Sequence, residues 1–141
     1  MGENMKDYNG FDGKTRVRNS RLIEKEVEAG LKEDRHETTC WICGQDKGIR
    51  EYHAEDYSEE NIVEESKIVC WRCHRHIHAA KRTDNWHKYE EDVENGIVGK
   101  PVYNKNYWTE NEDKPIKNRT KPVGFKHFWK YHEEMVKKLG C

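Results

Sequence analysis

The sequence contains no long hydrophobic run. No apolar stretch approaches the roughly 18 residues that a membrane-spanning helix requires. The polar start, MGENMKDYNG, also lacks the apolar segment of a secretory signal. We therefore expect no membrane partner and a cytoplasmic location.

Apolar residues are scarce throughout. The chain has 141 residues, a length typical of one domain, of which 33% are apolar and 38% are charged. This composition predicts only a small hydrophobic core. Small polar domains usually need a further constraint, and a bound metal ion would supply one.

Net charge is also small, at −1 with histidine neutral, which argues against a protein that coats nucleic acid through bulk positive charge. The charges are nevertheless segregated. Residues 51–65 contain seven acidic and no basic residues, whereas residues 114–130 contain six basic and no acidic residues. Such segregation suits a metal-dependent enzyme that acts on a polyanion; ordinary solvated charge is the alternative.

Four of the five cysteines form two C-x-x-C pairs, Cys40/Cys43 and Cys70/Cys73. Each pair turns two sulfurs toward one point, so the four thiolates suit one tetrahedral, structural Zn²⁺. In a cytoplasmic protein such pairs bind metal more often than they form disulfides, and a redox role is the weaker alternative. Cys141 is interpreted as a spare thiol.

Histidines accompany these pairs. His53 lies between them, and His74 and His78 directly follow the second. If the residues after Cys70 are helical, His74 and His78 share one face of the helix and could hold a divalent ion. Alternatively, His74, His76 and His78 are merely exposed, or contact phosphates in a module that only binds.

Periodicity and capping residues predict a chain of short elements. The first are a loose arm (1–15) and a helix that is capped by Ser20 and has Leu22, Ile23, Val27 and Leu31 on one face. Strands at 49–52 and 67–69 follow, around a polar loop (56–65), and a helix begins at Trp71. The chain continues with a helix from Asp84 to Gly96, an irregular connection (97–124) and a helix at 125–139. The aromatic row of the last helix is interpreted as core packing.

We group these elements into three segments of one compact domain. Residues 1–38 form the N-terminal arm and helix. Residues 39–96 form the zinc core with the helix that follows it. Residues 97–141 form a basic irregular segment and the C-terminal helix.

The stretch from Cys40 to His78 resembles the HNH nucleases of the ββα-metal class. Their pattern is C-x-x-C, a strand ending in His, a loop and then C-x-x-C-H-x-x-x-H, and EYHAEDYSEE is similar to small phage-encoded members. The resemblance implies an α+β fold, in which a zinc-stapled, treble-clef-like ββα-metal core is flanked by N- and C-terminal helices. It also implies an endonuclease that nicks or cuts DNA with Mg²⁺ or Mn²⁺, as a monomer or homodimer, in the cytoplasm of a phage host.

Two alignments with this family assign the catalytic residues differently. Aligning EDYS puts Ala54 where the family has its general base. His53 is then a metal ligand together with His74 and His78, and the chain is deficient in a base.

Shifting the alignment by one residue makes His53 the base instead. Asp56 or Asn61 then has to complete the metal site. Asn61 is also the nearest candidate for the asparagine of the motif, because Glu65 occupies its usual place. Arg75, between the two helix ligands, is expected to stabilise the phosphate, with a simple exposed residue as the alternative.

Basic residues around the metal helix and in the basic tail are the expected contacts to DNA phosphates. They are Arg72, Lys81, Arg82, Lys117, Arg119 and Lys121. A non-catalytic zinc-binding module that interacts with DNA or with protein is the alternative function.

Overall fold

Helices and a small two-stranded sheet make up the part of the chain that our computed structural model describes, residues 5–79, 84–103 and 114–140. The predicted α+β class is confirmed at this level. None of the helices in these ranges has the length and apolar character needed to cross a bilayer.

Two compact units are present, each built from segments that are far apart in sequence. The first combines Met1–Glu33, Ala54–Lys67 and Lys130–Cys141, and the second combines Asp34–His53 and Ile68–Trp129. The grouping into 1–38, 39–96 and 97–141 is a division by chain position and stays a prediction.

Helix α1 (Gly13–Glu28), in the first unit, begins earlier than the sequence predicts. The Asp12 carboxylate accepts a hydrogen bond from the N–H of Thr15 (2.8 Å), which satisfies a donor of the first helical turn. Ser20, the predicted cap, is instead buried inside the helix. The predictions of a cap at Ser20 and of a loose arm up to residue 15 are therefore wrong. Leu31 lies beyond the helix and is 76% exposed.

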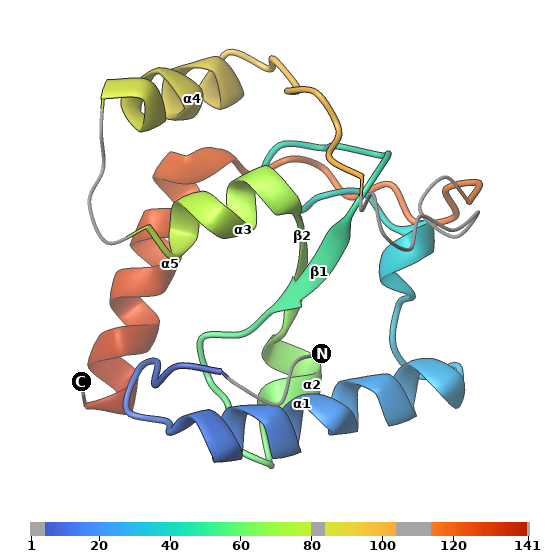
Figure 1. Cartoon of the computed structure of the whole chain (residues 1–141), viewed down its shortest axis with the longest axis vertical. Helices are drawn as coiled ribbons and strands as arrows, with labels where there is room; N and C mark the ends of the chain where they lie inside the picture. The colour runs from blue at the N-terminus through green and yellow to red at the C-terminus, as the bar shows by residue number, and fades with distance from the viewer. Residues whose placement is uncertain (1–4, 80–83, 104–113, 141) are drawn as a thin grey trace. The chain divides into compact units, whose positions relative to one another are not determined.

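The predicted polar loop at 56–65 ends in a short helix, α2 (Ile62–Glu65), which packs against α1 within the first unit (Figure 1). Ile62 is fully buried. The Asp56 carboxylate accepts hydrogen bonds from the N–H of Ser58 (2.8 Å) and from the Asn61 amide (3.0 Å). Two predicted site residues thus have structural partners in this loop.

A buried glutamate joins the three segments of the first unit. Glu55 is fully buried, and its carboxylate accepts hydrogen bonds from the Tyr8 hydroxyl (2.7 Å) and the Asn9 amide (2.9 Å) and contacts His132 Nδ1. Its own N–H donates to the Glu65 carboxylate (3.0 Å). Because a buried carboxylate without partners is costly, this network favours one arrangement of the three segments.

Glu65 is expected to titrate above the ordinary range of a glutamate. Burial raises the pKa of its carboxyl, and the hydrogen bonds from Tyr131, Glu55 and Asp56 only partly oppose the rise. Because the pKa is higher in the folded than in the unfolded chain, protonated Glu65 stabilises the fold, and this contribution is lost as pH rises through the folded pKa. A carbon-13 NMR titration, assigned with Glu65→Gln, should give a midpoint above the usual 4.5. A midpoint at or below that value would contradict this account.

The second unit contains the two-stranded sheet except for its residue Lys67, which belongs to the first unit. Strands β1 (Arg50–His53) and β2 (Lys67–Cys70) are neighbours, and β2 leads directly into helix α3 (Trp71–Ile77) (Figure 1). The structure confirms the strands predicted at 49–52 and 67–69, whose ends differ by at most one residue. It also confirms the start of the predicted helix at Trp71.

Arg50 anchors the start of β1. Although it is only 2% exposed, its guanidinium donates to the carbonyls of Arg35 (3.0 Å), His36 (2.8 Å) and Gly48 (3.0 Å). Two of these carbonyls belong to the 3₁₀ turn η1 (Arg35–Glu37). The charge is therefore buried with hydrogen-bond acceptors around it, and the strand that carries His53 begins at a fixed point.

Aromatic side chains form the core of the second unit. Phe125 and Phe128, from α5 (Gly124–Leu139), are 1% and 0% exposed and confirm the predicted core row. His76 is 1% exposed; its ring stacks on Trp86 of α4 (Asp84–Glu94) at a centroid distance of 4.7 Å. The interpretation of His76 as an exposed or phosphate-contacting residue is therefore wrong.

Phe125→Ala is expected to lower the free energy of unfolding by about 3–5 kcal/mol, because the ring fills the space between His76, Tyr89 and Phe128. Urea denaturation measures this loss. Lys126→Ala, at the neighbouring exposed position, is the control and should change stability by less than about 0.5 kcal/mol. Equal stability of the two variants would show that the aromatic cluster is not the core.

Candidate metal centres

The paired cysteines converge in the second unit, as predicted. The Sγ atoms of Cys40, Cys43, Cys70 and Cys73 all lie within 4.8 Å of one another, and all four residues are buried. In each pair the second N–H points at the first sulfur, with 3.5 Å from Cys43 N to Cys40 Sγ and 3.5 Å from Cys73 N to Cys70 Sγ. These contacts close the turns that aim both sulfurs of a pair at one point.

Gly44 closes the turn after Cys43. Its φ is +86°, in the left-handed region that favours glycine, and a Cβ there would lie 2.9 Å from Pro122 Cγ. A side chain at this position would strain the backbone and displace Pro122. The backbone of this loop therefore favours glycine at position 44.

The cysteine cluster fits a tetrahedral zinc ion. Cys43 Sγ and Cys70 Sγ are 3.6 Å apart, which is too far for a disulfide bond of about 2.05 Å. It is close to the sulfur–sulfur distance of about 3.8 Å that Zn–S bonds of about 2.3 Å produce. Burial, together with the neighbouring cysteines, raises the pKa of the Cys73 thiol, and a bound cation would favour the thiolate form of this residue. The cluster could therefore bind a metal such as zinc.

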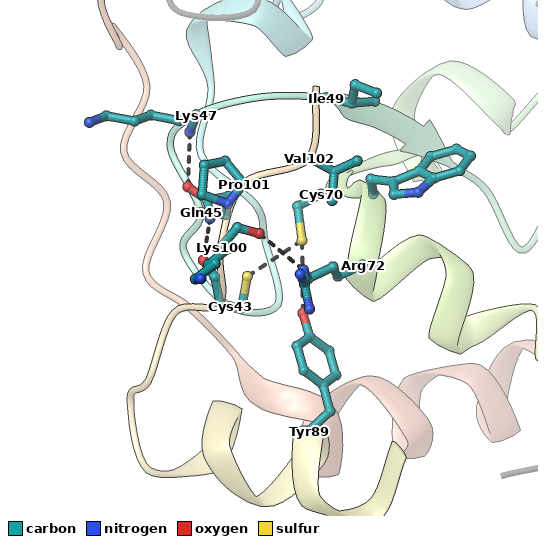
Figure 2. Close-up of a pocket in the computed structure, with 12 residues that line it drawn as sticks. Cys43, Gln45, Lys47, Ile49, Cys70, Arg72, Tyr89, Lys100, Pro101 and Val102 are labelled. Carbon is teal, nitrogen blue, oxygen red and sulfur yellow. Dashed lines mark hydrogen bonds between the residues drawn. The ribbon is translucent and has the colours of Figure 1, made fainter. Parts of the chain in front are cut away.

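Tyr89 of α4 reaches the same cluster. Its hydroxyl lies 3.1 Å from Cys73 Sγ and 4.0 Å from Cys70 Sγ, and Figure 2 shows the phenol directed at the Cys70 sulfur. Burial and the charges of the neighbouring thiolates raise the pKa of Tyr89 above its usual range. The sequence alone does not indicate this residue, because no local spacing pattern connects Tyr89 with the cysteines.

An irregular segment, 99–102, lines a pocket beside the cluster, together with Cys43 and Cys70 (Figure 2). Carbonyls of the segment accept hydrogen bonds from the Gln45 amide (2.7 Å), from Arg72 Nε (3.0 Å) and from the N–H of Ile49 (2.7 Å). These bonds hold the segment against the residues that follow the first cysteine pair and against the start of α3.

His53, His74 and His78 form a second group in the same unit. One ring nitrogen of each lies within 4.8 Å of the others, and the Nε2 atoms of His74 and His78 are 3.1 Å apart. His53 ends β1, His74 lies on α3, and His78 is the residue that ends α3. His53 is buried, His74 is half-buried and His78 is exposed, so the group is accessible from the side of His78.

Glu51 orients one of these histidines. Its Oε2 lies 2.9 Å from His74 Nδ1, which leaves His74 Nε2 for the group. Burial alone would raise the pKa of Glu51, but the hydrogen bond with His74 and the charge of that ring lower it overall. Carboxylates that hold an imidazole in this way are common partners of metal ligands. The signal for Glu51 was its position two residues before His53, which puts both side chains on one face of a strand.

The other predicted catalytic residues do not join this group. Ala54 is 1% exposed, directly after β1. Asp56 is buried and engaged by Ser58 and Asn61, and it is not a member of the histidine group that the described residues form. Arg75 is exposed on α3. The catalytic roles assigned to these residues stay predictions.

Two predicted DNA contacts are paired with carboxylates. Lys117 Nζ lies 2.8 Å from Glu37, and Arg119 lies 3.4 Å from Asp46. Because both bases are largely exposed, such pairs are weak and compete only modestly with a phosphate.

Of the remaining residues predicted to contact DNA, two lie in the described part of the chain. Lys121 is exposed, and Arg72 is exposed with its Nε donating to a backbone carbonyl. Lys81, Arg82 and Cys141 lie outside the described residues.

Comparison of this chain with protein-family models, curated proteins and solved structures finds no match. The functional argument therefore depends on the geometry of the two groups, the four cysteines and the three histidines.

Proposed function

We propose that the chain is a metal-dependent endonuclease of the HNH type, which hydrolyses phosphodiester bonds of DNA. The observation that supports this proposal is the convergence of His53, His74 and His78 in the unit that also contains the buried cysteine cluster. Four sulfur ligands complete the coordination of a structural ion, whereas three histidines leave positions open for water and substrate.

A divalent ion held by the histidines would stabilise the charge that develops on the phosphate and the leaving oxygen. The residues of the chain hold the histidine ligands in position and leave the ion accessible to the phosphodiester. Glu51 fixes the ring of His74, and burial fixes His53 at the end of β1. The phosphodiester would approach from the exposed side of His78, where Arg75, exposed on the same helix, can contact a phosphate oxygen.

The ligand set favours some ions over others. Magnesium prefers oxygen ligands and retains several waters, whereas imidazole nitrogen suits transition metals. Of the two ions expected from the sequence, Mn²⁺ therefore suits this group better than Mg²⁺. Co²⁺ and Ni²⁺ should bind more tightly than either, following the usual order of affinities.

In this proposal His53 is a ligand, because its ring nitrogen lies within 4.8 Å of those of His74 and His78. Ala54 then marks the position of the missing base, and Ala54→His supplies an imidazole there. Since Ala54 is 1% exposed, the larger side chain has to be accommodated at a cost of about 1–3 kcal/mol. Thermal unfolding of the variant checks that it is folded.

Relaxation of supercoiled plasmid tests the proposal. The wild-type chain and Ala54→His are incubated with Mg²⁺, Mn²⁺, Co²⁺ or Ni²⁺, and with EDTA. We expect nicking that EDTA abolishes and that Co²⁺ or Ni²⁺ supports better than Mg²⁺. Faster nicking by Ala54→His supports His53 as a ligand; equal nicking by both chains supports His53 as the base. No cleavage by either folded, zinc-containing chain would contradict the proposal and favour a non-catalytic zinc-binding module.

A further inference from the structure

We infer that the Tyr89 hydroxyl donates a hydrogen bond to the Cys73 sulfur of the metal-loaded cysteine cluster and thereby couples helix α4 to metal binding. Tyr89 is a positioning residue in this inference, since it acts on the ion through Cys73. The inference requires metal binding by the four cysteines and is independent of the proposed nuclease activity.

The hydrogen bonds at the cluster divide between backbone and side chain. Cys40 and Cys70, the first members of their pairs, accept the N–H of Cys43 and of Cys73. Cys73, the second member of its pair, is contacted by the Tyr89 hydroxyl at 3.1 Å. A metal-bound thiolate carries no proton, so the phenol is then the donor.

The phenol is held in place by the aromatic core. Its ring contacts those of His76, Trp86 and Phe125, at centroid distances of 6.2, 5.9 and 5.8 Å. The hydroxyl therefore lies at the cysteine cluster without ordering a mobile side chain. Figure 2 shows it extending from α4 toward the sulfurs that line the pocket.

The strength of this bond depends on the metal. Four thiolates around Zn²⁺ leave a net negative charge, and a hydrogen bond to a charged acceptor is roughly twice as strong as one between neutral groups. Loading the cluster therefore tightens the attachment of α4, and removing the hydroxyl weakens metal binding by the same coupling. Residues that hydrogen-bond to metal ligands typically contribute about 10–100-fold to metal affinity.

Tyr89→Phe tests the inference, because phenylalanine keeps the ring and removes only the hydroxyl. Tyr52→Phe is the matched control: it removes a hydroxyl in the same unit that accepts a bond from the N–H of Arg35 (3.0 Å). In the Co²⁺-substituted chain, the sulfur-to-cobalt charge-transfer band should move to lower energy in Tyr89→Phe alone. Chelator competition should show about 10–100-fold weaker zinc binding in the same variant. An unchanged band and unchanged affinity would overturn the inference.

A second measurement uses the wild-type chain and does not depend on how the variant folds. In the ¹¹³Cd-loaded chain, a coupling across the hydrogen bond should connect the ion with the Tyr89 hydroxyl proton. The N–H groups of Cys43 and Cys73, which face Cys40 and Cys70, provide internal positive controls. Couplings from both N–H groups without one from Tyr89 would also overturn the inference.

Discussion

Cys70→Ser is expected to unfold the second unit, because it removes one of the four buried sulfurs that could hold the structural ion. Structural zinc contributes about 10–16 kcal/mol in small zinc-binding peptides. The whole stability of a typical domain is about 5–15 kcal/mol. Far-UV circular dichroism and thermal unfolding should therefore show the loss of a cooperative transition. Stripping zinc from the wild-type chain with a strong chelator should have the same effect.

The control for this experiment is Cys141→Ser, which removes the one cysteine outside the two C-x-x-C pairs. This variant should retain the zinc and the unfolding temperature of the wild type. If Cys70→Ser, or the zinc-free chain, unfolded at the wild-type temperature, the cysteine cluster would not be a stabilising metal site.

His53→Ala is expected to lower the rate of plasmid nicking by about 10²–10⁴-fold. This range is typical of the loss of a general base. If His53 is a metal ligand instead, its loss should lower the rate by at least as much. The comparison uses whichever parent nicks faster, the wild type or Ala54→His. His87→Ala is the control, since His87 is exposed on α4 and should leave the rate unchanged. Nicking by His53→Ala at the parental rate would remove His53 from the site.

The affinity for Co²⁺ distinguishes the two roles of His53. As a ligand, His53 contributes to the affinity as His74 does, so His53→Ala and His74→Ala should weaken binding similarly. As a base, it contributes only to the rate, and His53→Ala should bind Co²⁺ like its parent.

The cysteine and histidine groups could be predicted from the sequence because their determinants are local. The C-x-x-C spacing builds each turn by itself, and the four-residue spacing of His74 and His78 needs only a helix after Cys70. Strand β2 also has a local signal, the apolar pair Ile68 and Val69 directly before Cys70, whereas β1 (Arg50–His53) contains no apolar run. These features hold regardless of what the rest of the chain contacts.

The partners of these ligands could not be predicted in the same way. Tyr89 reaches the cysteines only because α4 packs on the aromatic core, a contact between segments distant in sequence. Similarly, the surroundings of Glu55 depend on residues 46, 47 and 77 positions away, at Asn9, Tyr8 and His132. The start of α1 was missed for a different reason. Asp12 satisfies the capping rule as well as Ser20 does, but it precedes the apolar periodicity, which begins at Leu22 and indicates only the later part of the helix.

Native mass spectrometry of the zinc-purified chain titrated with Co²⁺ tests the central claim, that this chain has one structural and one open metal centre. The account predicts one zinc ion that resists EDTA and one additional ion that EDTA removes. His74→Ala should then retain the zinc and bind no additional ion. A single ion in both the wild type and His74→Ala would contradict the claim and leave the cysteine cluster as the metal centre of a binding module.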